Sequence, residues 1–195
     1  MLRLALLALA LGAAPQAKAP TQASLRKAFE NNRHTLVQVI GPHAKGPGVM
    51  VGGDGHVLTS VAFVGLEEAR VRVGEDEWRA EVVIADAYRG VAVVRITPPG
   101  EFRAAAVRLD DEVRRGDPLV AIRPGRDQPA PVLVEVRRVP RAESPFLELD
   151  APLAPGTPLF DSKGKLVALA TSRTRSGSRA LPIGSVKQQL QAQTP

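Results

Sequence analysis

The most regular feature of the chain is a series of short segments in which apolar and polar residues alternate. In residues 132–139, Val132, Val134 and Val136 alternate with Glu135 and Arg137, the pattern of a β-strand with one buried face. Glycine-rich or polar turns separate these segments. The pattern predicts six strands in each half of the chain, over residues 36–40, 48–51, 56–59, 69–73, 78–84 and 91–96, and over residues 118–122, 132–139, 146–150, 159–160, 166–171 and 178–182.

Helical spacing occurs at the two ends of this region. Leu25, Ala28 and Phe29 predict a helix over residues 21–32, and Ser185 is placed to cap a second helix that runs to residue 191. Evenly spaced short strands are typical of closed barrels. We therefore expect an all-β fold of two packed six-stranded antiparallel β-barrels with short N- and C-terminal helices. Within the first barrel, one face of a strand should carry Trp78, Ala80, Val82 and Ile84.

The Pro-Pro-Gly segment at residues 98–100 divides the chain. We expect an N-terminal barrel over residues 20–97, a linker over residues 98–108 and a C-terminal barrel over residues 109–195. Residues 2–11 are an apolar run with one positive charge, followed by small residues, which predicts a secretory signal peptide over residues 1–19. The run is shorter than the ~20 residues of a membrane span, so we expect a periplasmic or secreted protein with no stable membrane insertion after cleavage.

Composition removes several function classes. The 195 residues contain no cysteine, which excludes disulfides, thiol chemistry and a lipoprotein anchor. The net charge of +6 is spread among acidic residues, which favours solubility over a nucleic-acid site. Three histidines are too few and too poorly spaced for zinc, and the adjacent acids of residues 110–112 do not surround one point. We expect no metal, no cofactor and no nucleic-acid partner.

Several motifs follow one another in an informative order. They read GPGVMV at residues 46–51, HVLTS at residues 56–60, DAYRGVAVV at residues 86–94 and VRRGDPLVAI at residues 113–122. In order and spacing the chain resembles the trypsin-like serine proteases of the HtrA/Deg branch over nearly all of its expected mature length. Those proteases usually carry a peptide-binding PDZ domain after the catalytic domain. This sequence ends at Pro195 without one, so we expect any binding to use the barrels themselves.

The resemblance also implies a catalytic triad, and this chain departs from it at each position. Ala62 stands at the position of the histidine base, and Gly90 at that of the orienting aspartate. The nucleophile turn is replaced by APLAPGTPL at residues 151–159. Either the serine is deleted with two neighbours, or it is replaced by Pro155, which has no N–H and so also removes an oxyanion donor. Thr157 is the only substitute nucleophile.

These departures leave alternative functions. We expect an exported trypsin-like pseudoprotease, not an enzyme, that binds a polypeptide by β-augmentation along the strand before Pro182, or that regulates or scaffolds an envelope partner. The alternative is a divergent but active serine/threonine-type endopeptidase. A third interpretation is a structural interaction domain whose cleft has closed. Arg173, Arg175 and Arg179 flank a Ser-Gly turn beside the strand that, by the resemblance, forms the substrate-binding wall. Two interpretations remain, an acidic ligand held by these arginines or solvated loop side chains.

Overall fold

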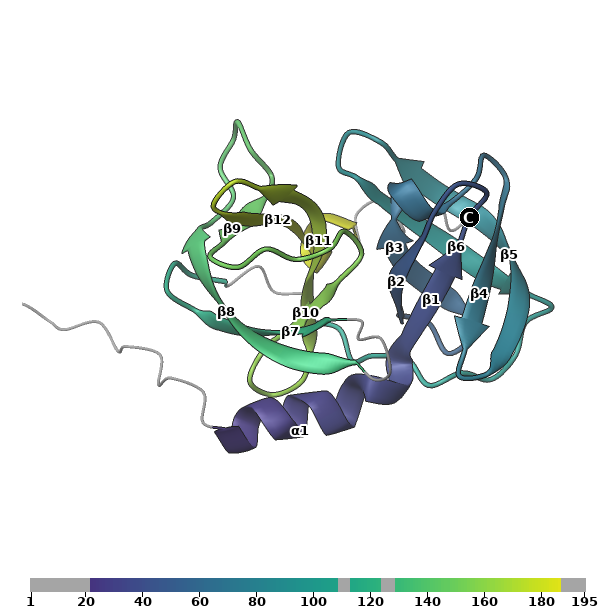
Figure 1. Cartoon of the computed structure of the whole chain (residues 1–195), viewed down its shortest axis with the longest axis horizontal. Helices are drawn as coiled ribbons and strands as arrows, with labels where there is room; N and C mark the ends of the chain where they lie inside the picture. Colours follow the sequence, from purple (N-terminus) through teal and green to yellow (C-terminus); the bar gives the residue numbers. More distant parts are fainter. Residues whose placement is uncertain (1–21, 109–112, 124–128, 187–195) are drawn as a thin grey trace, which may run out of the picture.

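The computed structural model describes residues 22–108, 113–123 and 129–186. They form two closed antiparallel barrels that pack side by side (Figure 1), which confirms the predicted fold class. The first barrel has the strand order β1-β2-β3-β6-β5-β4 and comprises β1 (Leu36–Ile40), β2 (Lys45–Met50), β3 (His56–Ser60), β4 (Glu68–Val73), β5 (Asp76–Asp86) and β6 (Val91–Thr97). The second has the order β10-β11-β12-β9-β8-β7 and comprises β7 (Pro118–Arg123), β8 (Ala130–Arg138), β9 (Leu147–Leu149), β10 (Pro158–Phe160), β11 (Leu166–Thr174) and β12 (Gly177–Pro182).

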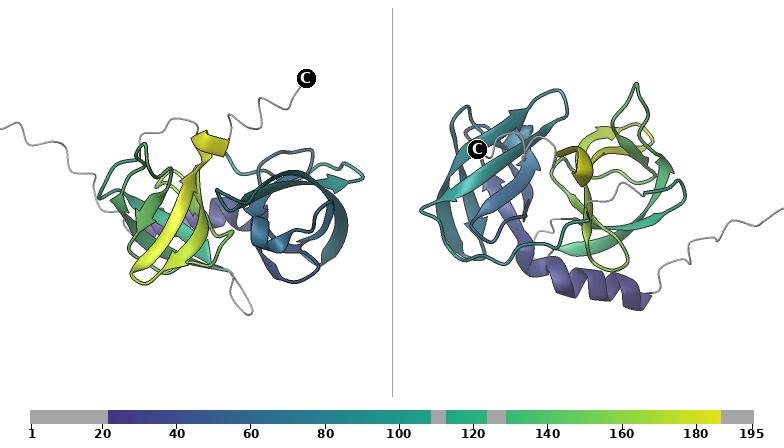
Figure 2. Two further views of the ribbon diagram at one scale, coloured as in Figure 1. Left: turned by 90° about the horizontal axis from the view of Figure 1, so that it is seen from above. Right: turned by 180° about the vertical axis from the view of Figure 1, so that it is seen from behind.

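Alternation places one set of side chains inside each barrel. Val39, Val57 and Val71 are completely buried in the first interior, and Leu147 and Leu159 are completely buried in the second. Viewed from above, the first barrel is a closed ring (Figure 2). Because closure pairs both edges of every strand, each barrel satisfies its backbone hydrogen bonds internally.

The prediction for residues 78–84 is wrong at one residue. Val82 packs with the interior of the first barrel, but Ile84 packs in the cluster between the barrels. A β-bulge between them shifts the pairing, so that Val82 faces Val94 and Ile84 faces Val93. An extra residue in one strand reverses which face the following side chains occupy, and the alternation of residue types does not reveal it.

The two barrels share a hydrophobic core. Val49 and Leu58 from the first barrel and Phe160 and Leu169 from the second belong to one buried cluster. Burial of this kind stabilises by about 25 cal/mol per Å² of apolar surface removed from water. The surface between the barrels, which we call the seam, is therefore a packed interface along part of its length.

Helix α1 (Gln22–Asn32) ends where predicted, and its predicted first residue, Thr21, lies outside the described residues. It lies along the second barrel before η1 (Arg33–Thr35) leads into β1 of the first (Figure 1). Asn32, which is 3% exposed, donates a side-chain hydrogen bond of 2.8 Å to the carbonyl oxygen of Gly164. The N-terminal helix thus connects the two barrels.

The closing helix begins at Ile183, so Ser185 lies inside it and does not cap it as predicted. Its predicted end and the predicted signal peptide lie outside the described residues. Within the three described ranges, no helix has the length and apolar character needed to cross a membrane.

Candidate functional site

The structure brings the predicted triad-equivalent positions together at the seam. Ala62 is exposed in the short turn η2 (Val61–Phe63), directly after β3. The amide of Val61 donates to the carbonyl oxygen of Gly90 at 3.3 Å. On the other side of Ala62, the ring of Phe63 lies so close to Gly156 that a Cβ atom there would be 3.3 Å from the ring. The turn η2 therefore contacts Gly90 and also Gly156, the residue after Pro155.

Gly90 has the backbone of a turn residue. Its φ is +73°, a left-handed conformation that glycine adopts without steric cost. The turn is held by the Gly90 amide, which donates to the Asp86 carbonyl at 2.8 Å, and by the Arg89 amide, which donates to the Asp86 carboxylate at 2.9 Å. A Cβ atom at Gly90 would lie 3.4 Å from the Cβ of Thr171 in the second barrel. A side chain at this position would therefore meet the opposite barrel directly.

The backbone amides of the shortened turn are already used. Gly156 donates to the Ala170 carbonyl at 2.7 Å, and Thr157 donates to the Ala154 carbonyl at 3.2 Å. Pro155 and Pro158 have no N–H. An oxyanion hole needs preorganised donors aimed at the developing charge. Residues 155–158 have no uncommitted amide to supply one.

Thr157 is completely buried, and its hydroxyl oxygen has no hydrogen-bond partner within the described part of the chain. A hydroxyl acts as a nucleophile when a neighbouring base accepts its proton and substrate can reach it. His56 lies at the start of β3, the opposite end from η2, where its Nδ1 pairs with the Asp54 carboxylate at 2.8 Å. That hydrogen bond is the main reason why the pKa of Asp54 lies below its usual value.

The shortened turn rests on the first barrel. Gly156 packs against the Pro47 carbonyl so closely that a Cβ atom there would overlap the oxygen. Thr59 donates to the same carbonyl at 2.9 Å. Upstream, the Ser178 hydroxyl accepts from the Leu153 amide at 2.6 Å and donates to the Ala151 carbonyl at 2.9 Å. The turn is therefore fixed from both barrels.

The edge predicted to receive a peptide is not free. Residues 178–180 of β12 pair with β11 on one side and with β9 on the other, so β-augmentation is blocked at these residues and the prediction is wrong for this part of the strand. Of the three nearby arginines, Arg173 donates from Nε to the Leu153 carbonyl at 3.2 Å, while Arg175 and Arg179 are exposed. Sequence reasoning considered a strand without its neighbours and could not see the second pairing.

The structure also contains a groove that sequence reasoning missed. It is a cavity of about 980 Å³ on the seam, lined among others by Arg33, Lys45, Pro47, Phe63, Arg72 and Ile122. We call it the seam groove. Its residues come from separate segments of both barrels and form no motif, so no local signal in the sequence could have found it.

The described ranges contain no group of three or more His, Cys, Asp or Glu residues that could hold a metal ion. Residues 46–169 match the family model described as a trypsin-like peptidase domain. A search of curated proteins found no match to the chain.

Proposed function

The chain belongs to the trypsin-like peptidase domain family, and we propose that it is a non-catalytic, exported member of the HtrA/Deg kind that binds a polypeptide or docks an envelope partner. The observation that carries the proposal is the state of the shortened turn. The amides of Gly156 and Thr157 are committed to carbonyls of their own barrel, and the flanking residues are prolines. The turn that should hold an oxyanion therefore has no free donor to offer.

Acyl transfer by this machinery needs a base, an orienting carboxylate, a nucleophile and oxyanion donors. Alanine at 62 and glycine at 90 carry no group that can accept or orient a proton. Loss of a single oxyanion donor costs about 10²–10³ in kcat, and loss of a triad member costs more. All these losses fall on one site, which supports a non-catalytic function.

The environment of Thr157 argues against its use as a substitute nucleophile. Its side chain is 0% exposed, and its neighbours in the turn are Gly156 and Pro158. Substrate could reach the hydroxyl only if the turn left the Pro47 carbonyl and the Ala170 strand. Thr157 instead resembles a core residue, since its hydroxyl is buried without a hydrogen-bond partner in the described part of the chain.

A binding function is supported because the barrel fold is intact while the triad-equivalent positions depart from the family pattern. Both barrels are closed and share a packed core, whereas the departures from the family pattern lie at Ala62, Gly90 and Pro155. Export is supported by the apolar run at residues 2–11. Since residues 178–180 of β12 are paired on both edges, we place a bound polypeptide on another surface.

The proposal is tested with purified protein, a fluorophosphonate probe and unfolded casein, with an active trypsin-like protease as the positive control. We expect neither labelling nor cleavage. A Thr157→Ala variant serves as the matched control for contaminating protease, because contamination would be unaffected by it. Cleavage that persists through purification and disappears in Thr157→Ala would establish the alternative, an active threonine-type endopeptidase.

A restoration variant examines the turn itself. Ala62→His, Gly90→Asp and Thr157→Ser together reintroduce the three functional groups but leave the amides of residues 156 and 157 bonded. We expect this variant, once shown by circular dichroism to be folded, to remain unlabelled. Probe labelling would contradict the importance that we assign to the missing donors.

A further inference from the structure

The seam groove has an apolar floor and a positively charged rim. Pro47 and Phe63 from the first barrel and Ile122 and Pro158 from the second line it. Arg33, Lys45 and Arg72 also line it, and no Asp or Glu does so among the described residues. Apolar walls that bury side chains, with a few charged groups that set orientation, are the usual composition of a ligand site.

Lys45 has no competing side-chain partner among the described residues. It is exposed at the start of β2, opposite Ile40 of β1, and makes no ion pair or hydrogen bond with a side chain of the described residues. An ammonium group without a partner keeps its full charge available to a ligand. Lys45 is therefore the simplest probe of what the groove attracts.

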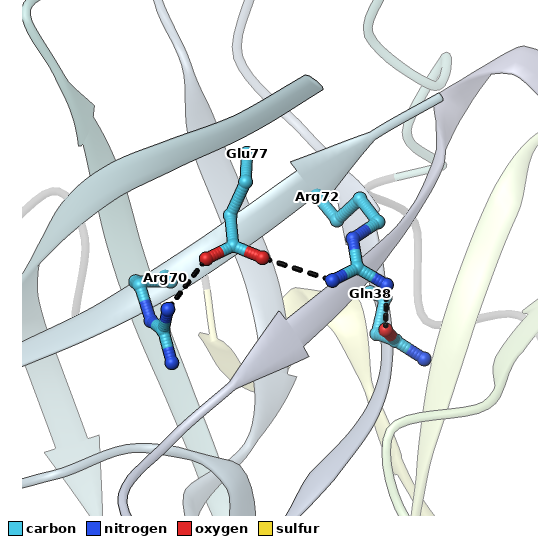
Figure 3. A network of polar contacts seen from close by, with 4 residues as sticks. All are labelled: Gln38, Arg70, Arg72 and Glu77. Carbon is cyan, nitrogen blue, oxygen red and sulfur yellow. Dashed lines mark hydrogen bonds and ion pairs between the residues drawn. The ribbon is translucent and has the colours of Figure 1, made fainter. Parts of the chain in front are cut away.

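Arg72 is held in place without being neutralised (Figure 3). Its guanidinium donates to the Glu77 carboxylate at 2.9 Å and to the side-chain oxygen of Gln38 at 3.2 Å. Glu77 is shared, because Arg70 donates to its other oxygen at 2.7 Å. One carboxylate between two guanidinium groups leaves a net positive charge. The same contacts fix the direction in which Arg72 projects.

Further positive charge near the groove comes from Arg33 and Arg103. The pKa of His34, which lines the groove, is lowered by partial burial and by the charges of Arg103 and Arg33. Arg33 pairs with Glu30 at 3.2 Å, but both side chains are more than half exposed, so this pair is screened and weak. An anion entering the groove would meet several cations at once.

We propose that the seam groove binds an acidic segment of a partner polypeptide, with apolar side chains on the floor and carboxylates at Lys45, Arg72 and Arg33. The inference rests on the proposed polypeptide-binding function and names its surface and the charge of its ligand. Single-stranded nucleic acid fits less well, since it needs exposed aromatic rings for stacking, and the Phe63 ring is packed against Gly46 and Gly156. Charge complementarity together with an apolar floor favours a peptide.

The test uses the full chain and two labelled synthetic peptides, followed by fluorescence anisotropy at physiological salt. One peptide alternates leucine with glutamate, and the other replaces every glutamate with glutamine. We expect the acidic peptide to bind at least about tenfold more tightly, and Lys45→Glu to weaken it about tenfold. Arg72→Gln, which keeps a polar group beside Glu77, should weaken it by a smaller factor. Higher salt should weaken it further.

The matched control is Arg175→Glu in the turn between β11 and β12, which makes the same change of net charge on an exposed residue of the second barrel. We expect it to leave the affinity unchanged. Equal binding of both peptides, loss of binding in Arg175→Glu but not in Lys45→Glu, or binding of single-stranded DNA or anionic vesicles in preference to the acidic peptide would each overturn the proposal.

The outcomes separate this inference from the proposed function. A partner that binds with the same affinity to wild type and Lys45→Glu would leave polypeptide binding standing and remove the groove as its surface. Casein cleavage abolished by Thr157→Ala would remove the non-catalytic function, while acidic-peptide binding sensitive to Lys45→Glu would still stand.

Discussion

Two neighbouring regions of the seam, the shortened turn and the seam groove, are built differently. Where the predicted triad positions meet, backbone touches backbone, because Gly156 rests on the Pro47 carbonyl and Gly90 faces Thr171. Beside this contact, the seam groove is a cavity of about 980 Å³ that Pro47 and Phe63 also line, together with cationic side chains. Gly156 and Pro47 therefore leave no room between them, whereas the neighbouring groove has room for a ligand. We place the proposed polypeptide binding in this groove.

In the tightly packed region around the shortened turn, we expect substitution of Gly156 to cause the largest loss of stability. Its φ is +79° and a Cβ atom would overlap the Pro47 oxygen, so Gly156→Ala combines a left-handed backbone with a clash. We expect a loss of about 2–4 kcal/mol in the free energy of unfolding, measured by urea denaturation. Gly116→Ala is the control, since Gly116 has φ +85° but no atom within 4 Å of the added Cβ. Equal losses in the two variants would mean that the contact with Pro47 contributes nothing.

The support of the turn from its own barrel depends on Ser178. Its hydroxyl joins the Leu153 amide and the Ala151 carbonyl, and the residue is 1% exposed. Ser178→Ala leaves both groups without this partner in the interior, so we expect a loss of about 1–3 kcal/mol. Ser162→Ala, at an exposed turn residue, should change thermal unfolding little. A Ser178→Ala variant as stable as wild type would show that the turn is held by packing alone.

A substitution at Thr157 should increase stability, in contrast to those at Gly156 and Ser178. Because its buried hydroxyl lacks a partner in the described structure, Thr157→Val keeps the shape and removes a desolvated polar group. We expect unfolding to cost up to about 1 kcal/mol more in the variant than in wild type, seen as a higher melting temperature. A clear loss of stability would indicate that the hydroxyl has a hydrogen-bond partner, such as a buried water.

The smallest expected effect is a pKa change beside Arg72, which lines the seam groove. The hydrogen bond from Arg72 is the main cause that lowers the pKa of Glu77, with Arg70 also contributing. A carboxyl group with a lowered pKa in the folded state stabilises above the unfolded pKa of 4.5, and this contribution is lost as the pH falls through the lower folded value. NMR titration should show the pKa of Glu77 rising toward 4.5 in Arg72→Gln. An unchanged pKa would mean that Arg72 is not held as the structure describes.

The fold could be predicted from the sequence because its pattern is local. Alternation and turn residues identify every strand of both barrels, and interruptions such as the bulge between Val82 and Ile84 leave no trace in residue type. The positions of Ala62, Gly90 and Pro155 followed from motif order. The second pairing of β12, the burial of Thr157 and the seam groove arise from contacts between distant segments, which no local pattern encodes.

Helix α1 has a consequence for the order of assembly. It is the first described element, yet its last residue, Asn32, bonds to Gly164, 132 residues later in the chain. During synthesis the helix emerges long before the hairpin that receives it, so it cannot complete its packing until the second barrel has formed. Contacts between such distant segments slow folding. We therefore expect the helix to dock late in folding, after both barrels have formed.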